Sequence, residues 1–99
     1  MGVTAPILTE DLKERIREVL RRHEVIRASV FGSVARGDAS PASDIDLLVE
    51  FPAGKSPWDL VDIQDDLSDT LQTRVDVLTF NELHPRMRQR VFAEQVPIL

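Results

Sequence analysis

Three short runs of β-branched and apolar residues alternate with segments of helical periodicity, and this order strongly restricts the possible folds. In the helical segments, apolar residues recur at spacings of three and four, which is typical of helices that bury one face. A sheet flanked by such helices predicts an α+β fold, a small mixed β-sheet with helices packed on it. The expected strands are 25–31, 44–51 and 74–80, and the expected helices are 9–23, 57–71 and 86–94.

Local signals support these limits. Thr9 is placed to cap the first helix, and Pro57 stands where the second can start. The apolar tail 96–99 is expected to dock on the core. With 99 residues and no linker or internal repeat, the chain is expected to form a single domain, 1–99.

Composition excludes several functions. The chain has no cysteine, which rules out a disulfide framework, a thiolate zinc site and a cysteine nucleophile. It has no long apolar stretch, so no membrane span or signal peptide is expected, and a cytoplasmic location is predicted. The net charge of −5 argues against binding nucleic acid by phosphate neutralisation alone. An acidic protein can still handle phosphates if a metal ion carries the positive charge.

Asp44 and Asp46 are the first candidate site residues. Alternate residues of a strand point to one face, so both carboxylates are expected to project together, with Ile45 turned into the core. Two such carboxylates repel each other unless a cation lies beside them, and hard oxygen ligands suit Mg²⁺. The other interpretation is that the first aspartate only caps a turn.

The turn at Gly32 and Ser33 is a candidate phosphate-binding element. Backbone N–H groups become free where a strand ends and a helical turn begins, and glycine lets a phosphate approach closely. A plain strand-to-helix turn is the other interpretation. Arg36, in the same turn, can offer a planar cation to phosphate oxygens or can balance Asp38 at the surface.

Asp76 lies in the apolar run 74–80, where burial of an ionised side chain is costly. If that strand lies beside the one carrying Ile45, Asp76 joins Asp44 and Asp46 on one face. Three carboxylates can hold two metal ions and accept the proton of an attacking hydroxyl. The alternative is an edge strand with Asp76 in water.

The string from Gly32-Ser33, through ten intervening residues, to Asp44-Ile45-Asp46 resembles the signature of the nucleotidyltransferase superfamily that includes DNA polymerase beta. It is most similar to the minimal nucleotidyltransferase branch, in which Gly-Ser-x-Ala-Arg-Gly leads into Ser-Asp-x-Asp-Leu. Here these motifs are residues 32–37 and 43–47. The resemblance implies that Asp44, Asp46 and Asp76 bind metal, and that Gly32 and Ser33 bind the nucleotide phosphates.

The resemblance also implies an activity. Members transfer a nucleoside monophosphate, commonly AMP from ATP with Mg²⁺, to an acceptor hydroxyl. Many minimal members are antitoxins that add AMP to a tyrosine of a partner HEPN-type toxin, so a heteromeric complex with such a toxin is expected. The alternatives are a non-catalytic antitoxin that neutralises the toxin by binding, and a subunit that modifies a small molecule of the aminoglycoside type. Neither nucleic acid nor a membrane is expected as a partner.

Other residues carry weaker expectations. The helix 57–71 is expected to show an acidic face to solvent, most simply a solvated surface. Trp58 is expected in the core or in a lid rather than as a base-stacking platform. His23 and His84 have no second ligand at metal spacing. The acidic face comprises Asp62, Asp65, Asp66 and Asp69.

Overall fold

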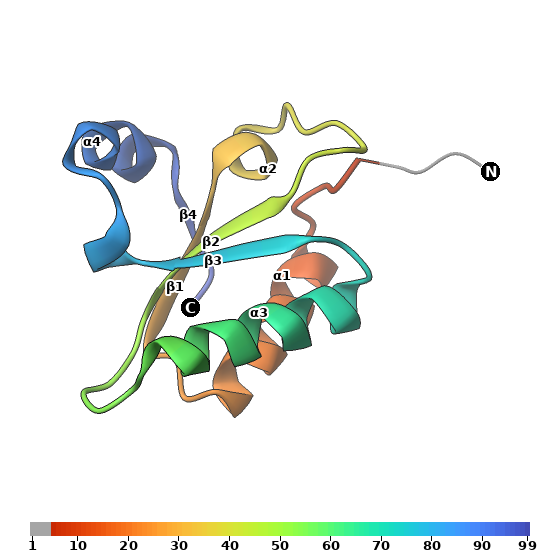
Figure 1. Ribbon diagram of the computed structural model, residues 1–99. Helices are drawn as coiled ribbons and strands as arrows, with labels where there is room; N and C mark the ends of the chain where they lie inside the picture. Colours follow the sequence, from red (N-terminus) through yellow and green to blue (C-terminus); the bar gives the residue numbers. More distant parts are fainter. Residues whose placement is uncertain (1–4) are drawn as a thin grey trace.

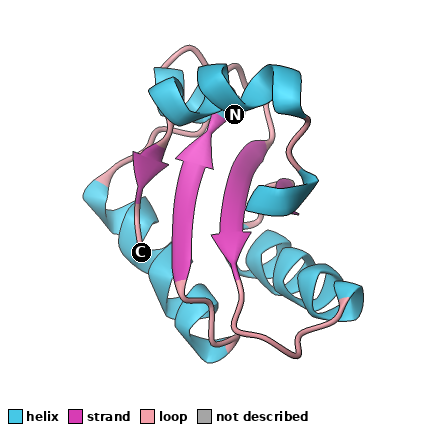
Figure 2. Ribbon diagram, turned by 90° about the vertical axis from the view of Figure 1, so that its left-hand side faces the viewer, coloured by secondary structure: helices cyan, strands magenta, loops and turns pink. Residues whose placement is uncertain are grey.

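The computed structural model describes residues 5–99, and within them the chain forms a four-stranded sheet with the order β3-β2-β1-β4. Helices α1 and α3 lie on one side of this sheet and α2 and α4 on the other (Figure 1), and a view turned by 90° shows helices on both sides of the strands (Figure 2). In chain order the elements are α1 (Glu10–Arg22), β1 (Arg27–Phe31), α2 (Gly32–Arg36), β2 (Ile45–Glu50), α3 (Pro57–Leu71), β3 (Val75–Thr79), the 3₁₀ helix η1 (Phe80–Glu82), α4 (Pro85–Glu94) and β4 (Val96–Pro97).

The sheet is mixed, as predicted. Strand β1 pairs antiparallel with β2 and with β4, whereas β2 pairs parallel with β3. The antiparallel register sets Phe31 opposite Asp46, at the end of β1 where α2 begins. The parallel register sets Asp46 beside Asp76. Two of the predicted site residues are therefore direct neighbours across two strands.

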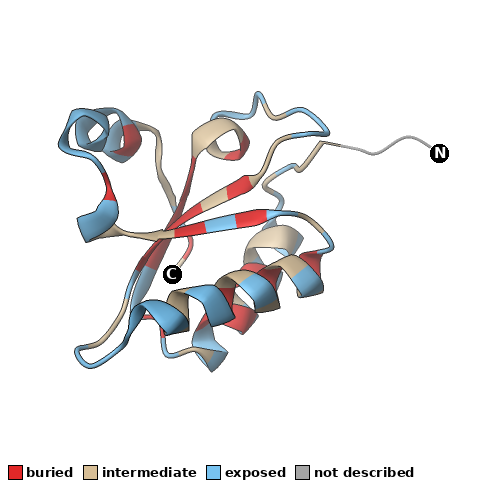
Figure 3. Cartoon of the chain, in the orientation of Figure 1, coloured by how far each residue is buried: buried red, intermediate tan, exposed pale blue. Residues whose placement is uncertain are grey.

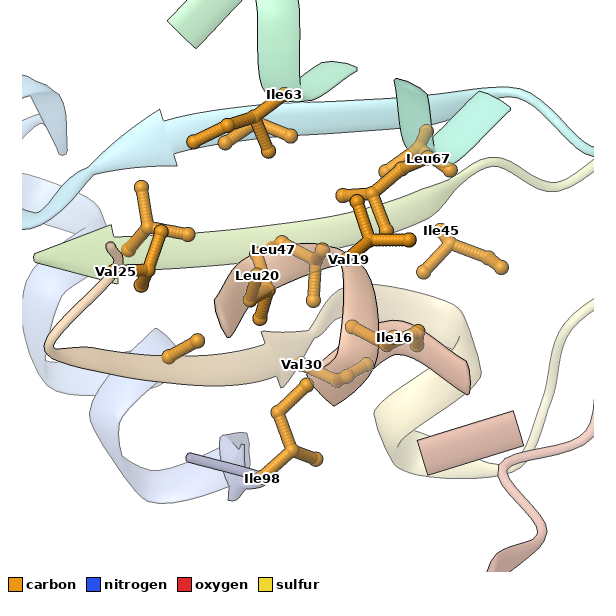
Figure 4. Close-up of a cluster of buried hydrophobic side chains, with 14 of the residues drawn as sticks. Ile16, Val19, Leu20, Val25, Val30, Ile45, Leu47, Ile63, Leu67 and Ile98 are labelled. Carbon is orange, nitrogen blue, oxygen red and sulfur yellow. The ribbon is translucent and has the colours of Figure 1, made fainter. Parts of the chain in front are cut away.

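The main core lies between the sheet and the helices α1 and α3. Alternate strand residues fill it, because successive side chains of a strand point to opposite faces. Figure 4 shows this cluster, which includes Ile45 and Leu47 from β2 with Ile16 and Leu20 from α1 and Ile63 and Leu67 from α3. On the opposite face, a smaller cluster is built from Phe31, Leu48, Leu83 and Val91. The side chains of Asp46 and Asp76 belong to this second face.

The predicted elements are confirmed to within a few residues at each end. Thr9 caps α1 by accepting a hydrogen bond from the Leu12 N–H at 3.1 Å. Ser56 and Asp59 form a capping box at the start of α3, with Pro57 in its first turn. The apolar tail docks on the core as expected through Ile98, but it also adds strand β4, which the sequence analysis did not predict. A two-residue strand with a proline has almost no periodicity to recognise.

Helix α3 corrects two expectations. Trp58 is 75% exposed, so it is not a core residue. Asp66 is only partly exposed, because its Oδ2 lies 2.8 Å from Nε2 of His23, while Asp62, Asp65 and Asp69 are exposed as predicted. The hydrogen bond from His23 is the main reason that the pKa of Asp66 lies below its usual value. Among residues 5–99, none of the helices combines the length and hydrophobicity needed to cross a bilayer.

The outer edge of β3 is covered by side chains from neighbouring elements. The outward N–H groups of Val75 and Val77 donate to the Ser68 hydroxyl at 3.3 Å and to Gln64 Oε1 at 3.1 Å. The Thr79 N–H donates to Glu82 Oε1 at 3.1 Å. Because these donors are occupied, the edge is a poor template for an added strand. The strand that carries Asp76 is thus held by β2 on one side and by α3 and η1 on the other.

Candidate active site

The candidate site begins with Asp46 on β2 and Asp76 on β3, which are paired in register. In a parallel pair, side chains in register point to the same face, so both carboxylates leave the sheet on the side of α2 and α4. Asp46 is partly buried and Asp76 is exposed. The predicted neighbourhood of these two residues is confirmed.

Burial and nearby negative charge both disfavour ionisation of Asp46. Burial of the carboxylate, followed by the charges of Asp76 and Asp44, together raise the pKa of Asp46 to about 6, against an opposing effect of Arg36. Burial and like charges both disfavour the ionised form. A cation beside Asp46 would relieve both costs, which is the electrostatic condition for a metal site.

Asp44 lies one residue before β2, and its Oδ1 is 3.5 Å from Nε of Arg74. Arg74 is largely exposed, so this ion pair is weak. Within the part of the chain that the structure describes, no three acidic or imidazole groups are already gathered closely enough to hold a metal ion. Asp46 and Asp76 therefore lie side by side, whereas Asp44 contacts Arg74, and the joining of all three carboxylates around a metal stays a prediction. All three donors are carboxylates, the class that suits Mg²⁺.

Gly32 makes the contact that only glycine permits. Its φ of 73° lies in the left-handed region, and a Cβ added there would lie 2.3 Å from Oδ2 of Asp46. A side chain at position 32 would occupy the place of the carboxylate. The glycine therefore lets the first turn of α2 approach Asp46. The role expected from the sequence, close approach of a phosphate to the Gly32 backbone, stays a prediction.

Ser33 follows Gly32 in the first turn of α2 and is partly exposed. The residue before this turn, Phe31, makes no side-chain capping hydrogen bond. The first N–H groups of a helix lack partners within the helix, so this turn offers donors to an anion. Gly32 lies against Asp46 and Ser33 follows it in the chain, and phosphate binding by this turn stays a prediction.

Arg36 makes one of the two interactions predicted for it, and it also has a second partner that was not predicted. Its Nε donates to Asp38 Oδ2 at 3.2 Å, and its Nη1 donates to Glu94 Oε2 at 3.1 Å. The hydrogen bond to Asp38, followed by the one to Glu94, raises the pKa of Arg36. The balancing of Asp38 is confirmed, and a role toward phosphate remains a prediction.

A hollow of about 210 Å³ joins these elements, lined by Gly32, Arg36 and Asp46 together with residues of α4. On sequence grounds Arg86, Arg88 and Arg90 could meet a nucleotide or a partner, but an ordinary solvated helix surface is the default interpretation, and nothing in the sequence places α4 beside the motif. The only sequence signal of the α4 residues is the spacing of four between Arg90 and Glu94, which is common in helices generally. The α4 residues that line the hollow include Met87, Arg90 and Glu94.

Paired strand carboxylates beside a glycine turn, on a mixed sheet, define a catalytic domain of the nucleotidyltransferase type. The model of the family described as "Nucleotidyltransferase domain" matches residues 12–99, and the chain belongs to this family of enzymes. The predicted fold class and enzyme class are both confirmed.

Two named relatives are similar to this chain over most of its length. A protein of Methanocaldococcus jannaschii named as a candidate protein adenylyltransferase is 46% identical over 89 residues, which cover 90% of this chain and 96% of the relative. The protein adenylyltransferase MntA of Thermococcus cleftensis is 32% identical over 80 residues, 81% of each protein.

Solved structures agree on the architecture. A candidate minimal nucleotidyltransferase superposes with a TM-score of 0.76 at 40% identity, over 86% of this chain and 87% of that one. A toxin–antitoxin with AMP-PNP gives a TM-score of 0.77 at 20% identity, over 88% of this chain and 72% of that one. A complex of a tri-AMPylated Shewanella oneidensis HEPN toxin with an MNT antitoxin gives 0.72 at 17% identity, over 91% and 71%. The last two establish a shared fold.

Replacement of Gly32 by alanine tests the contact with Asp46. Gly37 is the matched control, because it also has a positive φ (83°) but has nothing within 4 Å of an added Cβ. Both substitutions place alanine in the left-handed region, at about 1 kcal/mol. Gly32→Ala should cost about 1 to 3 kcal/mol more in the free energy of unfolding, because of the clash. The excess should shrink in an Asp46→Ala background, and an excess that persists there would place the clash elsewhere.

Titration of Asp46 should make the metal-free protein less stable as the pH rises. The folded pKa of about 6 lies above the ordinary value of 3.8, so the folded state binds more protons between these values, and stability falls as the pH rises through them. A pKa shift of about two units corresponds to about 3 kcal/mol in the free energy of unfolding, which partial exposure reduces to about 1 kcal/mol.

Asp46→Asn should therefore be more stable than wild type by this amount at pH 7.5 and lose the advantage near pH 4. The measurement is denaturant unfolding in the presence of EDTA. Asp62→Asn, on exposed α3, is the control, and an equal gain there would refute the assignment.

Proposed function

We propose that this chain is a Mg²⁺-dependent protein adenylyltransferase, which moves AMP from ATP to a hydroxyl of a partner protein. The observation that carries the proposal is the register of Asp46 beside Asp76, next to the Gly32 turn. This arrangement combines acidic ligands and free N–H donors at one end of a sheet. Transfer of a phosphoryl-linked group needs both.

In this proposal, Asp44, Asp46 and Asp76 hold two Mg²⁺ ions. When bound, the ions neutralise phosphate charge and keep the attacking and leaving oxygens in line. Asp44 would be the third ligand, and its present contact with the exposed Arg74 is too weak to oppose this role. The donors of Gly32 and Ser33 orient the phosphates.

The reaction is a displacement at the α-phosphorus of ATP. The acceptor oxygen forms a bond to that phosphorus, and the bond from the phosphorus to the oxygen bridging to the β-phosphate breaks, so that pyrophosphate leaves. Asp76 accepts the proton of the acceptor hydroxyl, because it is exposed at the surface from which an acceptor arrives. Asp46 is less suited to this step because Gly32 packs directly against it.

We further propose that the acceptor is a tyrosine of a HEPN-type toxin and that the chain acts as its antitoxin. Support comes from the relatives named protein adenylyltransferase and from solved structures of the same fold, one with AMP-PNP and one beside an AMPylated HEPN toxin. Asp46 lines a hollow of about 210 Å³ and Asp76 is exposed, so a large acceptor can approach the carboxylates from solvent. A working complex with the toxin follows from the same proposal.

The test is the intact mass of a HEPN-type partner purified with this chain and incubated with ATP and Mg²⁺. Wild type should add one or more AMP units to the partner, and Asp44→Asn/Asp46→Asn should add none, because two ligands of the site are lost. Asp62→Asn/Asp65→Asn, which removes two exposed carboxylates of α3, should transfer normally. Peptide mapping then identifies the acceptor residue.

The same experiment distinguishes neutralisation by binding alone. In that case the partner stays bound and inactive, its mass does not change with wild type, and the double aspartate variant neutralises it equally well. That result would contradict the proposed transfer.

A further inference from the structure

Two arginines from different elements donate to one carboxylate beside the candidate site. Nη1 of Arg36 on α2 lies 3.1 Å from Oε2 of Glu94, and Nε of Arg90 lies 3.3 Å from Oε1 of the same side chain. Glu94 thus uses both oxygens, one for each guanidinium. We call Arg36, Arg90 and Glu94 the arginine clasp.

The clasp lies beside Gly32 and Asp46 of the candidate site. All three residues line the hollow that also contains Gly32 and Asp46. The other two arginines of α4 do not line it. Arg86 is exposed, and Nε of Arg88 donates to the Leu83 carbonyl at 3.3 Å. Arg90 is therefore the α4 arginine best placed to meet a ligand of this hollow.

The side chains of Glu94 and Arg90 differ in how far they are exposed to solvent. The Glu94 side chain is 22% exposed, whereas that of Arg90 is 70% exposed. Desolvation opposes ionisation of Glu94, but the hydrogen bonds from Arg36 and Arg90 outweigh it and keep the pKa of Glu94 below its usual value. The carboxylate is thus an anion held by two cations, with one cation free to move through solvent.

The clasp is also a tie between helices. Val91 is the one buried residue of α4, and most of the helix is exposed (Figure 3). The bond from Arg36 to Glu94 connects this lightly packed helix to α2, which carries the Gly32 turn. A change of partner at Arg36 would therefore alter the connection between the two helices.

We propose that Arg36 and Arg90 bind the β- and γ-phosphates of the nucleotide, and that Glu94 occupies both arginines in the free protein as an internal competitor. The inference rests on the proposed function, since it assumes a triphosphate in the hollow. Guanidinium groups bind phosphate and carboxylate oxygens with the same planar geometry, so one anion can replace the other. Glu94 keeps the arginines positioned and lowers the affinity for triphosphate.

Two substitutions should have opposite effects on binding of the Mg²⁺ complex of α,β-methylene-ATP, which has all three phosphates and cannot transfer AMP. Arg90→Gln should weaken it about tenfold, the equivalent of one charge-assisted hydrogen bond. Glu94→Gln should tighten it several-fold, because a neutral amide competes less for the arginines. Neither should change AMP binding more than twofold, since AMP lacks the β- and γ-phosphates.

Isothermal titration calorimetry on the full chain measures these constants. Arg86→Gln controls for loss of a positive charge on α4, and Asp62→Asn for loss of a negative charge elsewhere; both should bind as wild type does. Thermal unfolding checks that each variant is folded. If Glu94→Gln loosens α4, the inference is tested by Arg90→Gln alone.

The outcomes separate the inference from the proposed function. Wild-type binding of the analogue together with an unchanged Arg90→Gln would overturn the clasp and leave the proposed function standing. An equal loss of AMP and analogue binding in Arg90→Gln would also overturn it. A folded Glu94→Gln that binds more weakly would show that Glu94 is only a structural tie. If wild type binds no triphosphate, both proposals fail.

Discussion

The parallel pairing of β2 with β3 is the interaction on which the candidate site depends. Its register places Asp46 beside Asp76, and a shift by one residue would turn one carboxylate into the core. The register is held by packing on one face of the sheet and by hydrogen bonds at the outer edge of β3. Ile45, Leu47, Val75 and Val77 pack into the main core, while Gln64 and Ser68 of α3 bind the outward N–H groups of β3. Hydrophobic packing thus holds two like charges together.

Holding these carboxylates together has an electrostatic cost, and this cost falls mainly on Asp46. Burial and the neighbouring carboxylates act on Asp46, which Gly32 allows to lie against the first turn of α2. Around this point the chain arranges compensating cations at some distance, with Arg74 on Asp44 and Arg36 near Asp46. Carboxylates that repel each other without a bound cation, beside free backbone donors, are consistent with a site built for a cation and an anion together.

Much of this could be predicted from the sequence. Strand periodicity and the breaks at Gly32, Pro52 and Pro85 located the elements, and alternation along β2 and β3 indicated which faces carry aspartates. The pairing of the two strands was conditional, because periodicity does not determine which strands are neighbours. The pairing of Arg36 with Glu94 was missed, since it joins positions 58 apart and depends on tertiary packing. Of the two places expected for Trp58, the core is wrong, because hydrophobic size does not determine the face of a helix.

The most direct test of the central claim, that the carboxylates of β2 and β3 form a cation and nucleotide site, is paramagnetic broadening by Mn²⁺ in ¹H–¹⁵N spectra of the chain with α,β-methylene-ATP. Mn²⁺ takes the same oxygen ligands as Mg²⁺. The amide signals of Gly32, Asp46 and Asp76 should broaden first, while those of Asp62 and Asp65 on α3 stay sharp. Broadening centred on the acidic face of α3, with the signals of Asp46 and Asp76 unaffected, would contradict the claim.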